Sequence, residues 1–119
     1  MTPKEDLRQE FRELVDEMIP EGGAEKDTRL TNVQIDRLLL RADNIYGAVS
    51  EGWVMKAGML SRELGQIDEY SVGQEKYRIT NLQTAISGAM TMAKQYARMA
   101  QTASSVGSVV LKIQPPAVL

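Results

Sequence analysis

Two long stripes of apolar and small residues with helical spacing dominate the second half of this sequence. The first stripe, within residues 44–64, consists of Ile45, Val49, Trp53, Ala57, Leu60 and Leu64. The second stripe, within residues 80–103, consists of Leu82, Ile86, Ala89, Ala93, Tyr96 and Ala100. Steps of three and four residues place each set on one face of an α-helix. The pattern therefore predicts two long helices that pack against neighbouring elements.

Small residues inside these two helices bear on how closely they pack. Close packing of a helix is easier where side chains are small. In the later helix the small residues beside the stripe are Ala85, Gly88, Ala97 and Ala103. We expect this helix to be central to the core; the alternative is that part of its stripe packs on another subunit. In the earlier helix, the glycines at 47, 52 and 58 indicate either a close approach of another backbone or a kink.

The first third of the chain predicts a shorter helix. Thr2 and Pro3 suit the cap and the first helical position. An apolar stripe from Leu7 to Met18 follows, and Pro20 ends it. We expect a helix of about four turns with a solvated, charged outer face.

A second short helix is expected to begin at Thr31. Thr31 and Gln34 have the spacing of a capping box, in which each side chain binds the backbone N–H of the other residue. The helix is expected to end near Ala42, with Asn44 capping the next one. Its predicted buried face consists of Val33, Leu38, Leu39 and Ala42.

Two stretches lack helical spacing. Residues 66–78 predict an extended loop with room for a short strand. Residues 104–119 combine a Ser- and Gly-containing hinge, a β-prone run over 109–113 and the pair Pro115-Pro116, with a single lysine as the only charge. The predicted fold is an all-α bundle of about four helices. One helical domain is expected over 1–103, and 104–119 is expected to be an extended C-terminal arm rather than a separate domain.

The composition excludes several kinds of catalytic and metal-binding chemistry. The chain has no cysteine and no histidine, which removes the thiolate nucleophile, the commonest general base and the commonest metal ligands. The carboxylates of the first helix are interleaved with cations, as on a solvated helix face. We therefore expect no enzyme activity, no metal and no other cofactor.

The charge and hydropathy of the chain disfavour two classes of partner, nucleic acids and membranes. The formal net charge is −2 and the basic residues are scattered, which disfavours nucleic-acid binding through clustered cations. No apolar run approaches the roughly 18–20 residues that span a bilayer, so no membrane is expected among the partners. The first residues are charged with no apolar stretch after them, which predicts synthesis in the cytoplasm.

From residue 30 to 103, the order of these parts resembles the head-to-tail adaptor (head-completion) proteins of long-tailed bacteriophages. In that family the loop between the two long helices carries a Val-Gly element, matched here by Val72-Gly73 within 70–77. The last helix ends in a Tyr/Ala-rich segment, matched by residues 92–97. The resemblance implies a viral structural protein of the virion neck, made in the host cytoplasm.

The same resemblance implies the partners. The chain would form a homo-oligomeric ring of neighbouring copies beneath the portal protein and would extend the DNA channel. It would dock the next head-completion or tail protein, and DNA would pass without sequence-specific binding. The expected contact residues lie in the loop and in the arm: Tyr70, Val72, Gly73, Tyr77, Val106, Val109, Val110, Leu111, Ile113, Pro115, Pro116 and Leu119. A β-prone arm suits strand addition to the edge of a partner's sheet.

An alternative from another class is a small helical regulatory or chaperone-like module. It would hold a peptide in a methionine-rich groove between the two long helices, with Met59 and Met90 in contact with it. In that case the arm is expected to fold back across the groove as a plug. An enzyme that relies on carboxylate, lysine or tyrosine groups is the most distant possibility.

Overall fold

The structure is a computed structural model that describes the backbone of residues 1–67 and 74–113, and the side chains of residues 1–67 and 76–103. Every regular element in this part of the chain is helical, so the predicted all-α fold is confirmed. The elements are α1 (Glu5–Val15), the 3-10 helix η1 (Glu25–Asp27), α2 (Asn32–Arg41), α3 (Ile45–Gly65) and α4 (Gln74–Ile113).

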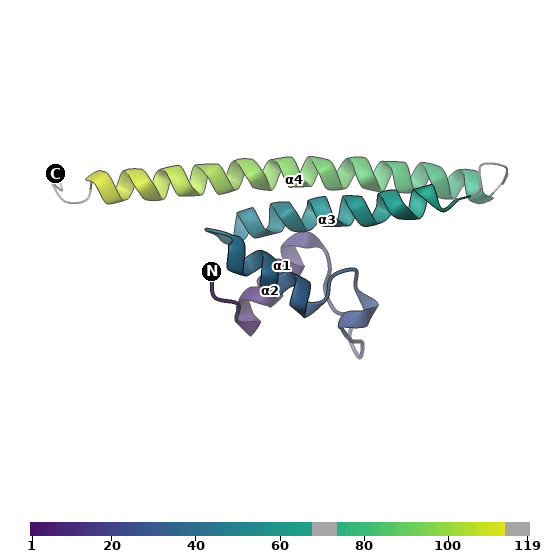
Figure 1. The fold of residues 1–119 in the computed structure, drawn as a ribbon, viewed down its shortest axis with the longest axis horizontal. Helices are drawn as coiled ribbons and strands as arrows, with labels where there is room; N and C mark the ends of the chain where they lie inside the picture. Colours follow the sequence, from purple (N-terminus) through teal and green to yellow (C-terminus); the bar gives the residue numbers. More distant parts are fainter. Residues whose placement is uncertain (68–73, 114–119) are drawn as a thin grey trace.

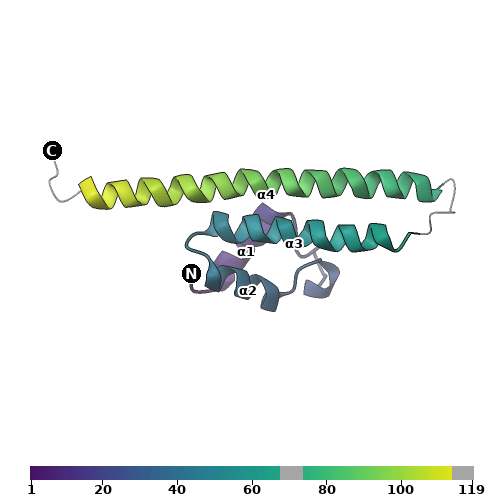
Figure 2. The same cartoon turned by 45° about the horizontal axis from the view of Figure 1, so that its top comes forward.

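The helices form an elongated bundle in which α3 is the middle layer. Figure 1 shows α4 lying antiparallel along one side of α3, with α1 and α2 on the opposite side, and Figure 2 gives the same order. The bundle measures 67 × 29 × 21 Å and has a Cα radius of gyration of 18.2 Å. A compact domain of this length has a radius of gyration of about 13.5 Å. The excess reflects the length of α4.

The main hydrophobic core joins α1, α2 and α3. Its fully buried residues are Phe11, Val15, Leu30, Ile35, Leu38, Leu39, Ala48 and Val49. Gly52 lets α1 approach α3 closely, because a Cβ atom at this position would lie 2.7 Å from Cζ of Phe11 and 3.1 Å from Cγ2 of Val15. A Cβ atom at Gly58 would have no neighbour within 4 Å. Of the two explanations for the glycines, close approach therefore holds at Gly52.

The contact between α3 and α4 buries only a narrow face of α4. Ala89 and Ala93 are 2% and 4% exposed. The Ser50 hydroxyl donates to the Ala93 carbonyl oxygen at 2.8 Å, and the rings of Tyr46 and Tyr96 stack with centroids 6.3 Å apart. Exposed positions include all four flanking small residues, Ala85, Gly88, Ala97 and Ala103. The prediction of a central core helix is therefore wrong, because α4 packs against α3 on one side only.

The caps of α2 and α3 are those that the sequence predicts. The Thr31 hydroxyl accepts from the Gln34 backbone N–H at 3.2 Å, and the Gln34 amide oxygen accepts from the Thr31 N–H at 2.9 Å. The Asn44 side chain accepts from the Gly47 N–H at 3.1 Å. Within α2 the buried face was predicted imperfectly, because Val33 is 60% exposed.

The ends of α1 differ from the prediction. Lys4 is the N-cap residue and makes no side-chain cap bond, so the expected start at Thr2 and Pro3 is wrong. The helix ends at Val15, ahead of Pro20, because Asp16 adopts the left-handed conformation with φ 59°. The N–H of Glu17 then donates to the Arg12 carbonyl at 2.8 Å, which closes the C-terminal bonding pattern of a Schellman motif.

The longest helix is longer at both ends than predicted. It begins at Gln74 rather than near 80, which shortens the expected 66–78 loop, and it runs to Ile113. The extended arm predicted from 104 onward is thus corrected over 104–113. Extending an existing helix adds one backbone hydrogen bond for each residue fixed, whereas an isolated strand gains none. Serine and valine cost only a fraction of a kcal/mol each, about 0.7 at most, in a helix interior. Residues 68–73 and 114–119 lie outside the described part.

Candidate functional site

The predicted contact residues that the structure describes lie at the two ends of α4. Tyr77 lies near the start of α4 and is 76% exposed. The other loop residues, at 70, 72 and 73, lie outside the described residues, as do those at 115, 116 and 119. The positions at 106, 109, 110, 111 and 113 lie on the last turns of α4, and their side chains are outside the description. Because 104–113 is helical, this segment is not preformed for strand addition.

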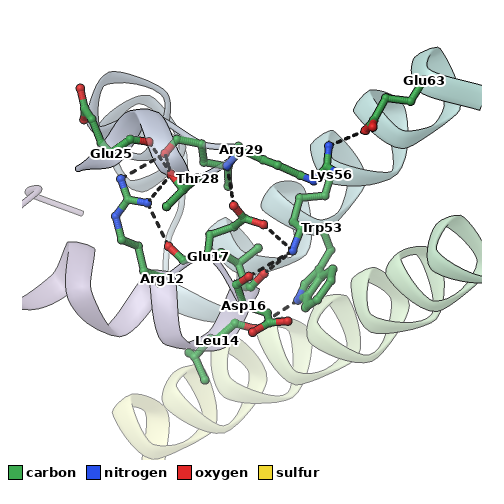
Figure 3. Close-up of polar contacts among 12 residues, drawn as sticks. Arg12, Leu14, Asp16, Glu17, Glu25, Thr28, Arg29, Trp53, Lys56 and Glu63 are labelled. Atoms are coloured by element: carbon green, nitrogen blue, oxygen red, sulfur yellow. Dashed lines mark hydrogen bonds and ion pairs between the residues drawn. The ribbon is translucent and has the colours of Figure 1, made fainter. Parts of the chain in front are cut away.

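A buried arginine organises the segment that follows α1. Arg12 is 2% exposed and makes four hydrogen bonds. Its Nη1 donates to the Glu17 carbonyl and to the Thr28 hydroxyl, both at 3.0 Å. Its Nη2 donates to the Leu30 carbonyl at 3.1 Å and to the Asn32 side chain at 2.9 Å. Figure 3 shows how the guanidinium holds the loop between α1 and α2 against the end of α1.

Two opposing effects act on the pKa of the Arg12 guanidinium. Burial lowers the pKa of the guanidinium, because the charged form loses hydration. The negative charges of Glu25 and Glu17 raise the pKa and offset part of this effect. The Glu25 carboxylate is held nearby by the Asn32 N–H, which donates to it at 2.8 Å.

A buried ion pair joins α3 to the segment after α1. Lys56 and Glu17 are 7% and 9% exposed, and the Lys56 Nζ atom lies 2.8 Å from Glu17 Oε2. The ammonium also donates to the carbonyls of Val15 at 2.9 Å and Asp16 at 3.3 Å. It lies 4.5 Å from the centroid of the Trp53 ring, a cation–π distance. Lys56 therefore caps the C-terminal carbonyls of α1 from α3 (Figure 3).

This polar network is saturated. The Trp53 indole N–H donates to the Leu14 carbonyl at 3.2 Å, and the Arg29 N–H donates to the second oxygen of Glu17. Among the described residues, no buried side-chain nitrogen or oxygen lacks a partner, and no group of three or more acidic side chains is placed to hold a metal ion. The buried polar groups of this network are paired with one another or with the backbone. We therefore interpret the network as a structural joint between α1 and α3.

An open groove of about 980 Å³ lies beside this joint, between α3 and α4. One wall carries Trp53, Lys56 and Leu60 of α3. The α4 side of the groove is lined by Gln83, Thr84, Ala85, Ser87, Gly88, Ala89, Thr91 and Met92, and Asp16 and Arg29 complete the lining. The α4 wall thus carries mainly hydroxyls and small residues with one methionine, and Met59 and Met90 are not part of the groove lining.

The expected plug of this groove does not fit the geometry. Met92 marks the nearer end of the groove on α4, and Ile113 lies about 30 Å further along the helix. Residues 104–113 therefore continue along α4 away from the groove and do not fold back across it, and residues 114–119 lie outside the described part.

The sequence interpretation missed a separation of charge along the chain. Residues 1–69 contain 15 of the 16 acidic and 9 of the 14 basic residues, while residues 70–119 contain 1 acidic and 5 basic residues. The signal was present in the order of the charges, but the overall net charge of −2 conceals it. In the fold, the basic part is mostly α4, whereas the acidic part comprises α3 together with α1 and α2, which lie across α3 from α4 (Figure 1).

Together these features define an elongated all-α bundle with a saturated polar joint and one long, half-exposed helix. Comparison with protein-family models, with curated proteins and with solved structures found no match. In the described part of the chain, no helix combines the length and the apolar character needed to cross a membrane.

Proposed function

We propose that this chain is a structural adaptor of the phage head-to-tail connector type, without enzymatic activity. It assembles as a ring beneath a portal protein, at the virion neck, and docks the next head-completion or tail protein. The observation that carries the proposal is α4. This helix has 40 residues against 21 in α3, so it presents far more surface than its own bundle covers.

The way in which α4 leaves the bundle supports this role. The Asn44 side chain, which caps the start of α3, donates to the Ala100 carbonyl at 3.2 Å. Beyond this point α4 continues to Ile113, about 20 Å past the start of α3. A helix that projects this far from a small domain is typical of an element that packs on another chain. An unpacked helix is only marginally stable in water, and most helical stability in proteins comes from packing.

Assembly on a portal ring tests the proposal. The chain is mixed with the portal protein encoded in the same genome, and the products are separated by size and imaged by electron microscopy. We expect a ring complex with the full chain. A truncation after Ala103 is expected to keep its helices, measured by circular dichroism, and to lose docking. A Tyr77→Ala variant is expected to weaken docking without changing the fold. Normal docking of the truncated chain would contradict the role of the projecting helix.

The groove between α3 and α4 favours a second candidate, a helical peptide-binding module. Its test uses Gly88, where an added Cβ would meet nothing within 4 Å. A Gly88→Trp variant places a large side chain at the groove, and Gly58→Trp is the matched control on α3, where an added Cβ likewise meets nothing within 4 Å. Loss of partner binding in Gly88→Trp, with portal assembly absent in the parent chain, would favour this module over the adaptor.

A further inference from the structure

The outward faces of α1 and α4 carry opposite charge and lie on opposite sides of α3. On α1, the carboxylates of Asp6, Glu10 and Glu13 are exposed and follow one another at steps of four and three residues. The buried side of α1 packs through Phe11 and Val15, so these carboxylates point away from α3. None of the three takes part in an ion pair within the described residues.

The outward face of α4 is basic and rich in hydroxyl groups. Lys76, Lys94 and Arg98 are exposed and share the side of the helix that lies away from Ala89 and Ala93. The same side carries four exposed hydroxyl side chains, Thr80, Thr84, Ser87 and Thr91, and the last three also border the groove. Over residues 76–113, α4 contains no acidic residue. The cations at 76, 94 and 98 likewise form no ion pair within the described part.

Within one chain these two surfaces cannot meet, because α3 lies between them (Figures 1 and 2). We propose that the basic outward face of α4 in one copy docks on the acidic outward face of α1 in a second copy. The steps match, since Lys94 and Arg98 are four residues apart, as are Asp6 and Glu10. Because the two surfaces differ and lie on opposite sides, the contact is heterologous and repeats from copy to copy.

The strength and salt dependence of this contact follow from its exposure. Exposed ion pairs stabilise only slightly, so a few pairs give a weak contact between free chains. The Debye length is about 10 Å at 0.1 M salt and about 3 Å at 1 M, so salt weakens the contact. The inference rests on the proposed function, in that a ring of identical subunits needs such a contact. Its test uses the purified chain alone, so its failure leaves assembly on a portal to be judged separately.

The test reverses the charge of one face at a time. In one variant, Lys94→Glu with Arg98→Glu, both outward faces are acidic. In the other, Asp6→Lys with Glu10→Lys, both are basic. Each variant alone is expected to self-associate at least tenfold more weakly than the parent chain, by sedimentation at low salt. An equimolar mixture is expected to associate again, because every α4 then finds an oppositely charged α1.

Controls keep the result tied to this contact. Arg37→Glu with Arg62→Glu changes the net charge by the same amount as Lys94→Glu with Arg98→Glu, but at exposed positions on α2 and α3. This control is expected to leave self-association unchanged. Circular dichroism and thermal unfolding confirm that each variant is folded. A parent chain that stays monomeric at low salt overturns the proposal. So does a mixture that associates no better than its separate components, or a control that weakens association as much.

Discussion

The Lys56 ammonium and the Glu17 carboxylate lie 2.8 Å apart, and both side chains are almost fully removed from solvent. The pair connects the middle helix of the bundle to the first residues after α1. Removal of one partner of a buried ion pair typically costs about 3–5 kcal/mol, because the remaining charge is left uncompensated. The free energy of unfolding should therefore depend strongly on this pair.

A Lys56→Met variant should lower the free energy of unfolding by about 3 kcal/mol, measured by urea denaturation. The combination of Lys56→Met with Glu17→Gln should recover part of the loss, because the buried Glu17 carboxylate is then no longer left uncompensated. Arg41→Met breaks the exposed contact of Arg41 with Glu51, 3.4 Å long, and should cost less than about 1 kcal/mol. Equal effects of Lys56→Met and Arg41→Met would contradict the assigned role of the buried pair.

Gly52→Ala should destabilise the protein by about 1–3 kcal/mol. The new Cβ would lie 2.7 Å from the Phe11 ring, which is fully buried in the core. Gly58→Ala makes the same chemical change on the same helix where nothing lies within 4 Å, and should stabilise by about 0.5–1 kcal/mol. The melting temperatures of the two variants should move in opposite directions, and a rise in both would refute the close approach.

Asp16→Gly should stabilise the protein by about 0.5–1 kcal/mol. Asp16 has φ 59°, a conformation that costs other residues more than glycine, and its charge lies at the negative end of the α1 dipole. Asp16→Ala separates the two effects, since it removes the charge but keeps the Cβ atom, and it should gain less than the glycine variant. Thermal unfolding at neutral pH measures both, and a more stable alanine variant would be inconsistent with a conformational cause.

Thr31→Ala should cost about 1 kcal/mol, because the N–H of Gln34 loses its acceptor at the start of α2. Thr2→Ala is the natural comparison. The sequence also allows Thr2 as a cap, but the structure places the N-cap of α1 at Lys4 with no side-chain bond. Its substitution should change the free energy of unfolding by less than about 0.5 kcal/mol. Chemical denaturation of both variants decides whether capping follows the structure or the sequence pattern.

Much of the fold was predictable because it depends on neighbours in the sequence. The capping box at Thr31 and the cap at Asn44 follow from side chains that bind backbone groups within a few residues. The stripes that define α3 and α4 likewise follow from helical spacing, as does the all-α class. The extent of α4 was not predictable in this way, since serine, glycine and valine near 104–110 weaken a helix without excluding it.

The candidate site was less predictable than the fold. Arg12 and Lys56 look like solvated surface cations in the sequence, and their burial depends on carbonyls and carboxylates brought together by the fold, from positions such as Glu17 and Leu30. The exposed hydroxyl and basic face of α4 depends on α3 being its packing neighbour. No local pattern encodes which side of an amphipathic helix is left without a partner.

What the sequence alone determined about this protein is its helical class, the caps of its middle helices and an uneven distribution of charge. Each of these depends on local hydrogen bonds, on spacing along a helix or on composition. Only the tertiary structure decided that Arg12 and Lys56 are buried and that Gly52 admits Phe11. It alone placed the acidic face of α1 and the basic face of α4 on opposite sides of α3. These relations depend on contacts between distant residues, which form only when the helices pack.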